Sequence, residues 1–328
     1  MSFSDEDENV LLDDSDEMQE EDESEDAEPK KKEEKPKIEP CSLTQDMIGQ
    51  NLSTLCRTGD GLSHAFIRLD LQNRNLVDIV ILSSFVHLRF LDISSNYLTD
   101  LSPLATLTEL LWIKADSNQV QSLQEQSFDQ LSYLQWFSLM SNRLSDIKGL
   151  GVPALESLNL TDNSIQTLSG LDCNKLTNLI TLELRGNHLE TTDGIFLPNL
   201  RRLYLANNKI KRLEGLDKLE HLTILQLRDN QLESLDGISP RLKSLQYLNV
   251  RGNKLSSLHA LQSLMGVAQT LQTLVLADNP LSEMENYRLI VVARLSFLKR
   301  LDKGTVSIVE QAEAQERIKE FPDFTEDH

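Results

Sequence analysis

The sequence has few of the residues on which several classes of protein depend. Its 328 residues include only three cysteines, too few to cross-link a domain of this size, so we expect reduced thiols in a cytosolic protein. Lysine and arginine number 32 against 52 acidic residues, which leaves no basic surplus for nucleic acid. No apolar run reaches the ~18–20 residues that cross a bilayer. The acidic N-terminus differs from a secretory signal, so we predict neither membrane binding nor export.

Patterns that hold metals, cofactors or reaction intermediates are also missing. The six histidines show no H-E-x-x-H spacing, and the three cysteines form no C-x-x-C pair, so a zinc site is not expected. Gly59-Asp60-Gly61 is not followed by the lysine and serine or threonine of a phosphate-binding loop. We therefore predict a protein that is not an enzyme, with no cofactor and no small-molecule substrate.

Most of the negative charge lies at the start of the chain. Residues 1–40 hold 18 acidic residues and 5 lysines, a net charge of −13, whereas the other 288 residues hold 34 acidic and 27 basic residues, a net of −7. Such a segment buries too little apolar surface to offset the entropy of ordering, so we predict a disordered leader over 1–40. Lys30–Lys32 fits a charged linker or a nuclear import signal, and the acidic part either solvates the chain or docks on a basic partner.

Leucine is abundant, with 61 residues, and its spacing is periodic. The pattern L-x-x-L-x-L-x-x-N-x-L first appears clearly at 88–98, and a degenerate earlier copy has Arg74 in the asparagine slot. Nine full copies in register predict a leucine-rich repeat solenoid. The asparagines recur at intervals of 21 to 26 residues, at Asn96, Asn118, Asn142, Asn163, Asn187, Asn208, Asn230, Asn253 and Asn279.

Each slot of the repeat has a physical reason. The L-x-L centre suits a short strand whose leucines enter a core shared between coils, because one repeat cannot bury its own leucines. The asparagine amide has donors and an acceptor for buried backbone groups of its own coil and the next. Beyond it the apolar spacing becomes three, which favours short 3₁₀ or single-turn helices. We predict an α/β solenoid, an arc of about nine to ten repeats of about 22 residues with a parallel concave sheet.

The end coils need caps because they would otherwise expose leucine. Apolar residues at helical spacing, with Thr44 as the N-cap and Gly59 as the stop, predict a helical cap at the N-terminal end. A charged helix from about residue 305 to 321 is predicted to cover the last coil. The predicted segments are the leader 1–40, the N-terminal cap 41–66, the repeat domain 67–302 and the C-terminal cap helix and tail 303–328.

A candidate partner site lies on the concave face, which shows the residues six, four and two positions before each asparagine. The first of these columns places Phe90, Trp112 and Trp136 on consecutive coils, with Met140 nearby. Tryptophan is favoured at interface hot spots, so this aromatic row indicates a binding site. The alternative is that the leader or a neighbouring loop covers the row within the monomer.

A basic patch is predicted further along the same face. It suits an acidic peptide or a tubulin-like acidic tail, unless Glu183, Asp229 and Glu233 balance it as a solvated face. The full set of candidate partner-binding residues is Phe90, Trp112, Lys114, Trp136, Met140, Arg185, Arg202, Tyr204, Arg228, Tyr247 and Arg251.

The repeats and their C-terminal end resemble a known subclass of leucine-rich repeat proteins. Repeats of this length resemble those of the type-1 phosphatase regulator and the leucine-rich axonemal dynein light chain. The terminal motif is similar to a cap shared by that subclass, by acidic nuclear phosphoproteins and by a spliceosomal subunit. It comprises Asn279-Pro280-Leu281, Tyr287-Arg288, Leu298 and Leu301-Asp302.

A closer resemblance is to the family of leucine-rich repeat-containing protein 23, a radial-spoke component of motile cilia and sperm flagella. It covers about residues 43–320, and much of it lies outside the repeat consensus. The stretches that carry it are 43–47, 55–65, 87–89, 98–104, 227–231 and 243–249.

The resemblance implies a structural adaptor of the axonemal radial spoke. Such a protein lies in the cytoplasm, on the cytoskeleton of the cilium or flagellum, and has other spoke subunits as partners. The alternatives are a regulatory subunit of a type-1 protein phosphatase and an acidic nuclear histone-binding protein.

Overall fold

The apolar residues of the L-x-L segments build one continuous core. The computed structural model describes residues 39–59 and 61–317, and the predicted leader lies outside them except for its last two residues. Both apolar residues of each segment are buried, from Leu91 and Ile93 in the first clear repeat to Leu274 and Leu276 in the last. The repeats stack as one coil each because none could bury its leucines alone. The predicted leucine-rich repeat solenoid is confirmed.

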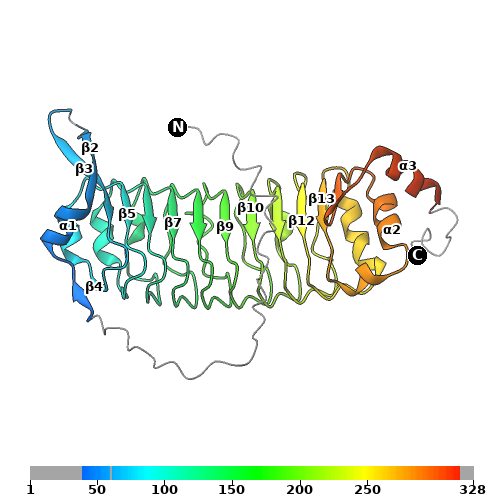
Figure 1. The fold of residues 1–328 in the computed structure, drawn as a ribbon, viewed down its shortest axis with the longest axis horizontal. Helices are drawn as coiled ribbons and strands as arrows, with labels where there is room; N and C mark the ends of the chain where they lie inside the picture. Colours follow the sequence, from blue (N-terminus) through cyan, green and yellow to red (C-terminus); the bar gives the residue numbers. More distant parts are fainter. Residues whose placement is uncertain (1–38, 60, 318–328) are drawn as a thin grey trace, which may run out of the picture. The chain divides into compact units, whose positions relative to one another are not determined.

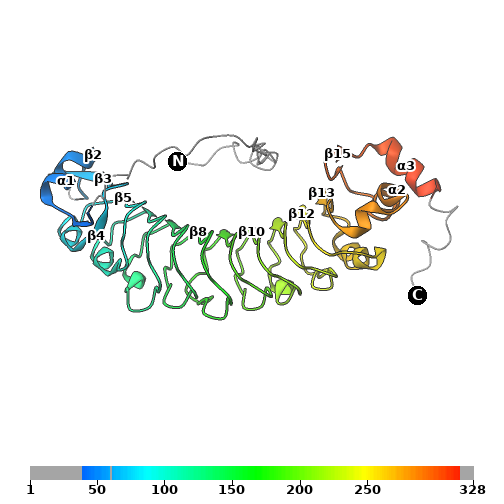
Figure 2. The ribbon, with the colours of Figure 1, turned by 60° about the horizontal axis from the view of Figure 1, so that its bottom comes forward.

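The strands of successive coils form one sheet on the inner side of the arc (Figures 1 and 2). Within the described residues it has 13 strands, parallel from β3 to β14 and antiparallel only at the ends. The parallel strands are β3 (His64–Asp70), β5 (Phe90–Asp92), β6 (Trp112–Lys114), β7 (Trp136–Ser138), β8 (Ser157–Asn159), β9 (Thr181–Glu183), β10 (Arg202–Tyr204), β11 (Ile224–Gln226), β12 (Tyr247–Asn249), β13 (Thr273–Val275) and β14 (Arg300–Leu301). Equivalent repeat positions therefore lie side by side on neighbouring strands.

The outer side of the arc consists of loops and short 3₁₀ helices, as the spacing of three predicted. Leu104 lies within one of these helices and is buried against the core. The convex segments contribute apolar side chains from one side while the strands contribute theirs from the other. The 3₁₀ helices are η2 (Val80–Ser84), η3 (Ser102–Thr106), η4 (Phe128–Gln130), η5 (Leu216–Lys218), η6 (Leu258–Val267) and η7 (Pro280–Glu283).

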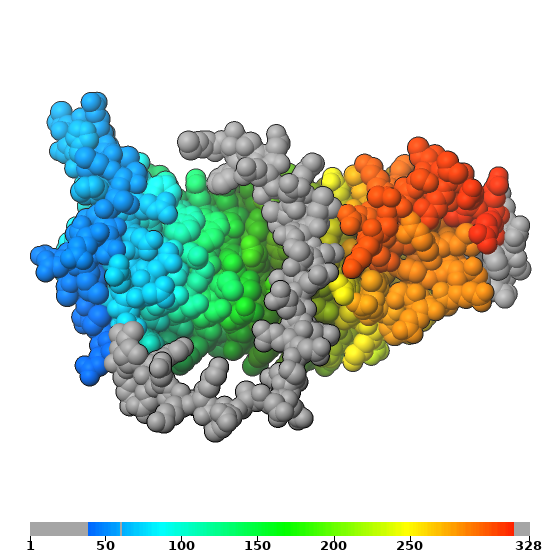
Figure 3. Space-filling view, in the orientation of Figure 1, coloured from blue at the N-terminus to red at the C-terminus, as the bar shows by residue number. Residues whose placement is uncertain are grey.

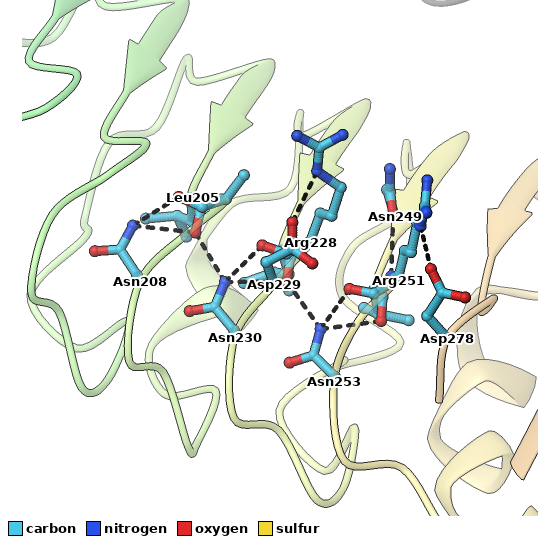
Figure 4. Close-up of polar contacts among 12 residues, drawn as sticks. Leu205, Asn208, Arg228, Asp229, Asn230, Asn249, Arg251, Asn253 and Asp278 are labelled. Carbon is cyan, nitrogen blue, oxygen red and sulfur yellow. Dashed lines mark hydrogen bonds and ion pairs between the residues drawn. The ribbon is translucent and has the colours of Figure 1, made fainter. Parts of the chain in front are cut away.

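The asparagines form a ladder of hydrogen bonds along the core (Figure 4). In Asn230, the Oδ1 atom accepts from the backbone N–H of Ile210 at 3.0 Å. Its Nδ2 atom donates to the carbonyls of Leu205 at 2.9 Å, Leu227 at 3.0 Å and Arg228 at 3.3 Å. The amide thus binds its own coil and the preceding coil, whereas the sequence suggested the next one. The same pattern recurs at the other rungs, for example at Asn118 and Asn187.

The ladder is closed at both ends by different residues. At the start, where Arg74 replaces asparagine, its backbone N–H donates to Asn96 Oδ1 at 3.0 Å and its guanidinium donates to Asn51 Oδ1 at 2.9 Å. At the end, Asp302 Oδ1 accepts from the backbone of Leu276 at 2.7 Å and Ala277 at 2.8 Å. A charged group therefore ties each end of the ladder to a cap.

The N-terminal cap is only partly helical, which corrects the predicted helical segment 41–66. Helix α1 (Gln45–Asn51) begins where expected, with Thr44 Oγ1 accepting from Met47 N–H. It ends at Asn51, well before Gly59, and the chain continues as β2 (Leu52–Arg57), antiparallel to β3. Hydrogen bonding to β3 covers the first parallel strand better than a longer helix would, because it pairs the open backbone edge. The hairpin projects beyond the coils (Figure 1).

Two small strands complete the N-terminal end. Strand β1 (Cys41–Ser42) pairs in parallel with β4 (Leu76–Asp78) in a separate two-stranded sheet. Among the described residues no helix has the length and apolar character needed to span a membrane.

The C-terminal cap contains two helices and a short strand. Helix α2 (Tyr287–Arg294) packs against α3 (Ile308–Arg317), and Arg288 joins them by ion pairing with Glu310 at 2.6 Å. The predicted helix from residue 305 starts later, because Gly304–Thr305 forms strand β15 against β14. The part of that prediction beyond residue 317 lies outside the described residues.

The hydrogen-bond ladder predicts a large cost for removing one rung. In Asn187→Leu, the N–H of Ile165 loses its acceptor inside the core. The carbonyls of Leu160 and Leu184 each lose one of two donors, because Asn163 and Asn208 still donate to them. The orphaned N–H costs ~1–3 kcal/mol, so the free energy of unfolding in urea should fall by at least ~1 kcal/mol. The control is Asn174→Leu, at an exposed asparagine, which should change it by less than ~0.5 kcal/mol. Equal effects of the two substitutions would contradict the role of the ladder.

Candidate functional site

The two tryptophans of the chain form a stacked pair on the concave face. Trp112 and Trp136 lie opposite each other on β6 and β7, with ring centroids 4.6 Å apart and planes at 8°. Parallel pairing in register places equivalent side chains about one strand spacing apart, ~4.8 Å, which is a stacking distance. Both rings are half-buried, so the stack keeps apolar surface open on the inner side of the arc.

The other predicted aromatic residues lie around this stack. Phe90 on β5 is the register partner of Trp112 and is also half-buried. Met140 follows β7 and is half-buried as well. The structure therefore brings the predicted aromatic row together, and the coils of the N-terminal half, coloured cyan to green, lie side by side in the space-filling view (Figure 3).

A partly buried carboxylate beside the stack was missed by the sequence analysis. Asp116 accepts hydrogen bonds from Ser138 Oγ and, at 3.0 Å, from the backbone N–H of Met140. Lys114 forms an ion pair with it at 3.9 Å. Burial raises the pKa of Asp116, while the two hydrogen bonds and Lys114 oppose the shift. These contacts hold the segment of Met140 against the coil of Trp112. The sequence did carry a signal for Asp116, because it lies two residues before Asn118 and therefore in one of the columns of the concave face.

The predicted arginines are accompanied by carboxylates. Arg228 Nε lies 3.1 Å from Asp229 Oδ2, and Arg251 Nε lies 2.5 Å from Asp278 Oδ2 (Figure 4). Asp278 was not foreseen as a partner, because it lies one coil further along the chain. These contacts reduce the positive potential that the sequence alone suggested.

Arg202 lies at the edge of this group, on β10. Its Nε donates to Thr181 Oγ1 at 3.1 Å. Burial raises the pKa of Glu183 on β9, and Arg202 opposes the shift. Three acids were predicted to balance the arginines. Glu183 interacts electrostatically with Arg202, and Asp229 forms an ion pair with Arg228. Glu233 is exposed.

The remaining predicted residues differ in how much surface they offer. Arg185 is exposed, and Tyr204 is half-buried on β10. Tyr247 on β12 is only 9% exposed, and its Oη lies 3.5 Å from Asn249 Nδ2. Tyr247 therefore supports the sheet more than it presents a contact surface. Within residues 39–59 and 61–317, no group of three metal-binding side chains comes together.

These features define a leucine-rich repeat protein, a class whose fold is typically a non-catalytic module for protein interaction. Family models described as leucine-rich repeat match residues 181–321 and 87–107. Among solved structures, a leucine-rich repeat protein of Leptospira interrogans is 23% identical, covering 78% of this chain and 82% of its own, with a TM-score of 0.53. The leucine-rich repeat domain of APL1B is 20% identical over 71% of this chain and 67% of its own, with a TM-score of 0.57. At these identities the likeness concerns the fold alone.

The chain belongs to the leucine-rich repeat-containing protein 23 family. It is 47% identical to the Homo sapiens member over 86% of this chain and 82% of that protein. The Mus musculus member is 45% identical with the same two coverages. The Xenopus tropicalis member is 46% identical over 84% of this chain and 78% of its own length. The family resemblance seen in the sequence is confirmed.

The stacked indoles predict a distinct optical signal. Two tryptophans at 4.6 Å and 8° should give coupled bands in the circular dichroism spectrum, and Trp136→Leu should abolish the coupling. Loss of the aromatic contact should cost ~0.5–1.5 kcal/mol beyond the lost burial. Tyr133→Leu, at a site that is 63% exposed, should leave the coupled bands unchanged. Coupled bands that persist in Trp136→Leu would contradict the stacking.

The raised pKa of Glu183 predicts a pH-dependent cost. The folded state binds this proton more tightly than the unfolded state, so Glu183 lowers stability as the pH rises above its unfolded value of 4.5. In Glu183→Gln this contribution disappears, so the mutant should gain stability relative to the wild type between pH 4 and pH 7. Chemical unfolding at both pH values measures the difference. Glu190→Gln, at an exposed site, should show no such change, and an equal change there would contradict the assignment.

Proposed function

We propose that this chain is a non-catalytic structural adaptor of the axonemal radial spoke. In this role it supports the motility of cilia and sperm flagella through protein–protein binding by its arc. Its location would be the cytoplasm, on the cytoskeleton of the cilium or flagellum, with other radial spoke subunits as partners. Nucleic acid, membranes and small-molecule substrates have no part in this function.

The observation that supports this proposal most directly is a preformed apolar surface on a rigid arc. The half-buried Trp112–Trp136 stack lies on strands whose coils share one core and one hydrogen-bond ladder. A surface that is already ordered loses little conformational entropy on binding, which favours a permanent structural contact. Family membership adds to this support, because the resemblance implies a radial-spoke component.

Fractionation of ciliated or sperm cells tests the proposal. A spoke component should stay with the axoneme after detergent extraction and leave it only at high salt. A regulatory subunit of a type-1 phosphatase, the alternative, should be soluble in detergent and co-purify with phosphatase activity. Tubulin serves as the retained control. Complete release of the chain by detergent alone would overturn the radial-spoke proposal.

A further inference from the structure

The concave face is chemically divided along its length. Its N-terminal half, on β5 to β7, carries the aromatic row of Phe90, Trp112 and Trp136. Its C-terminal half, from β10 onward, carries Arg202 and the arginines that follow β11 and β12. A surface that is apolar at one end and basic at the other fits a partner that has apolar residues at one end and acidic residues at the other.

The N-terminal hairpin extends the apolar half, a feature absent from the predicted site. Arg68 on β3 is the register partner of Phe90, so Phe66, two residues earlier, lies on the same face of the sheet. Leu55 on β2 pairs directly with Phe66. Leu55 is 58% exposed and Phe66 is 46% exposed. The apolar surface therefore continues past the first coil onto the hairpin.

The charges of the two halves set the orientation of a charged partner. Asp70 is exposed on β3, and Asp116 lies beside the tryptophan stack. Arg68 is exposed on β3 and Lys114 pairs with Asp116, so acidic and basic groups nearly balance in this half. A partner's acidic residues would therefore be attracted at the arginines of the other half instead.

The ion pairs of Arg228 and Arg251 do not prevent this attraction. The carboxylates are 49% and 59% exposed and the arginine side chains 22% and 39%. An exposed pair contributes only ~0–1 kcal/mol, so a partner can replace Asp278 at Arg251, and its carboxylates can join Asp229 at Arg228.

The dimensions of the surface favour an α-helix as its occupant. Its three columns lie two residues apart, so they span four residue steps, ~13 Å of extended chain, close to the ~10–12 Å diameter of a helix. Arg202 lies three strands beyond Trp136, and Arg228 follows the fourth. At ~4.8 Å per strand this is ~14–19 Å, or roughly three turns of helix.

We propose that the concave face binds one amphipathic α-helix of a partner protein. Bulky apolar residues of that helix pack on Trp112 and Trp136, and a cluster of carboxylates about three turns away pairs with Arg202 and Arg228. This inference rests on the proposed function in one respect only, that the arc binds proteins. It adds the chemistry of the partner and the direction in which the helix lies.

The tryptophan stack supplies the readout for a direct test. The chain has two tryptophans, both in the stack, so intrinsic tryptophan fluorescence of the full chain reports on the apolar end without a label. The probes are tryptophan-free helical peptides with two leucines and a cluster of four glutamates placed about one, two, three or four turns apart. The peptide with about three turns should bind tightest, with a saturable change in fluorescence. If no peptide gives a saturable change up to 1 mM, the proposal is wrong.

Paired charge variants test the basic end. In the double variant Arg202→Gln and Arg228→Gln, affinity for the best peptide should fall by about tenfold or more at low salt, and most of its salt dependence should vanish. The matched control is Lys209→Gln with Lys211→Gln, which removes the same charge at two exposed lysines outside the concave columns. Equal loss in both double variants, or equal binding of all four peptide spacings, would overturn the proposal.

The peptide test and the fractionation test fail independently. A chain that stays with the axoneme but binds none of the peptides refutes the helix proposal and leaves the radial-spoke proposal standing. A chain that binds the three-turn peptide but is released by detergent does the opposite. Calorimetry of Trp112→Leu adds a separate check at the apolar end, where affinity for the same peptide should also fall by about tenfold.

Discussion

Every other feature of this structure depends on the satisfaction of buried backbone groups between coils. A leucine core holds the coils together without direction, since apolar burial is nearly indifferent to rotation or sliding. The asparagine amides add direction, because each one binds its own coil and the preceding coil through a fixed set of carbonyls and N–H groups. An orphaned group in this core is costly. The ladder therefore sets the register in which neighbouring strands align.

That register creates the functional surface. Trp112 and Trp136 are 24 residues apart in sequence, and their rings stack because the ladder places their strands side by side in register. The same alignment brings Asp278 to Arg251 across 27 residues. The concave face is thus a consequence of the core, and its side chains are ordered before any partner arrives. The aromatic half and the arginine half differ in chemistry while sharing one rigid support.

The charged groups of this face differ in how deeply they are buried, and their contributions differ accordingly. Exposed pairs such as Arg251 with Asp278 lie in water, where they contribute little to stability and exchange readily with other charges. Asp116 and Glu183 are more buried, and this burial raises their pKa values because it disfavours the ionised forms. Asp116 compensates through hydrogen bonds to Ser138 and Met140. The face therefore combines replaceable surface charges with carboxylates held in the structure.

The sequence by itself determined the solenoid, the strand of each repeat and the column to which each concave residue belongs, because these follow from a periodic pattern of leucine and asparagine. Only the tertiary structure decided how the ends are closed and which charges meet. The residues after Asn51 had helical spacing but became a strand, because β3 offers an open edge that hydrogen bonding satisfies. Phe66 and Leu55 joined the apolar surface for the same reason. Such contacts depend on what lies next to a segment in space, and a repeat pattern carries no information about its own ends.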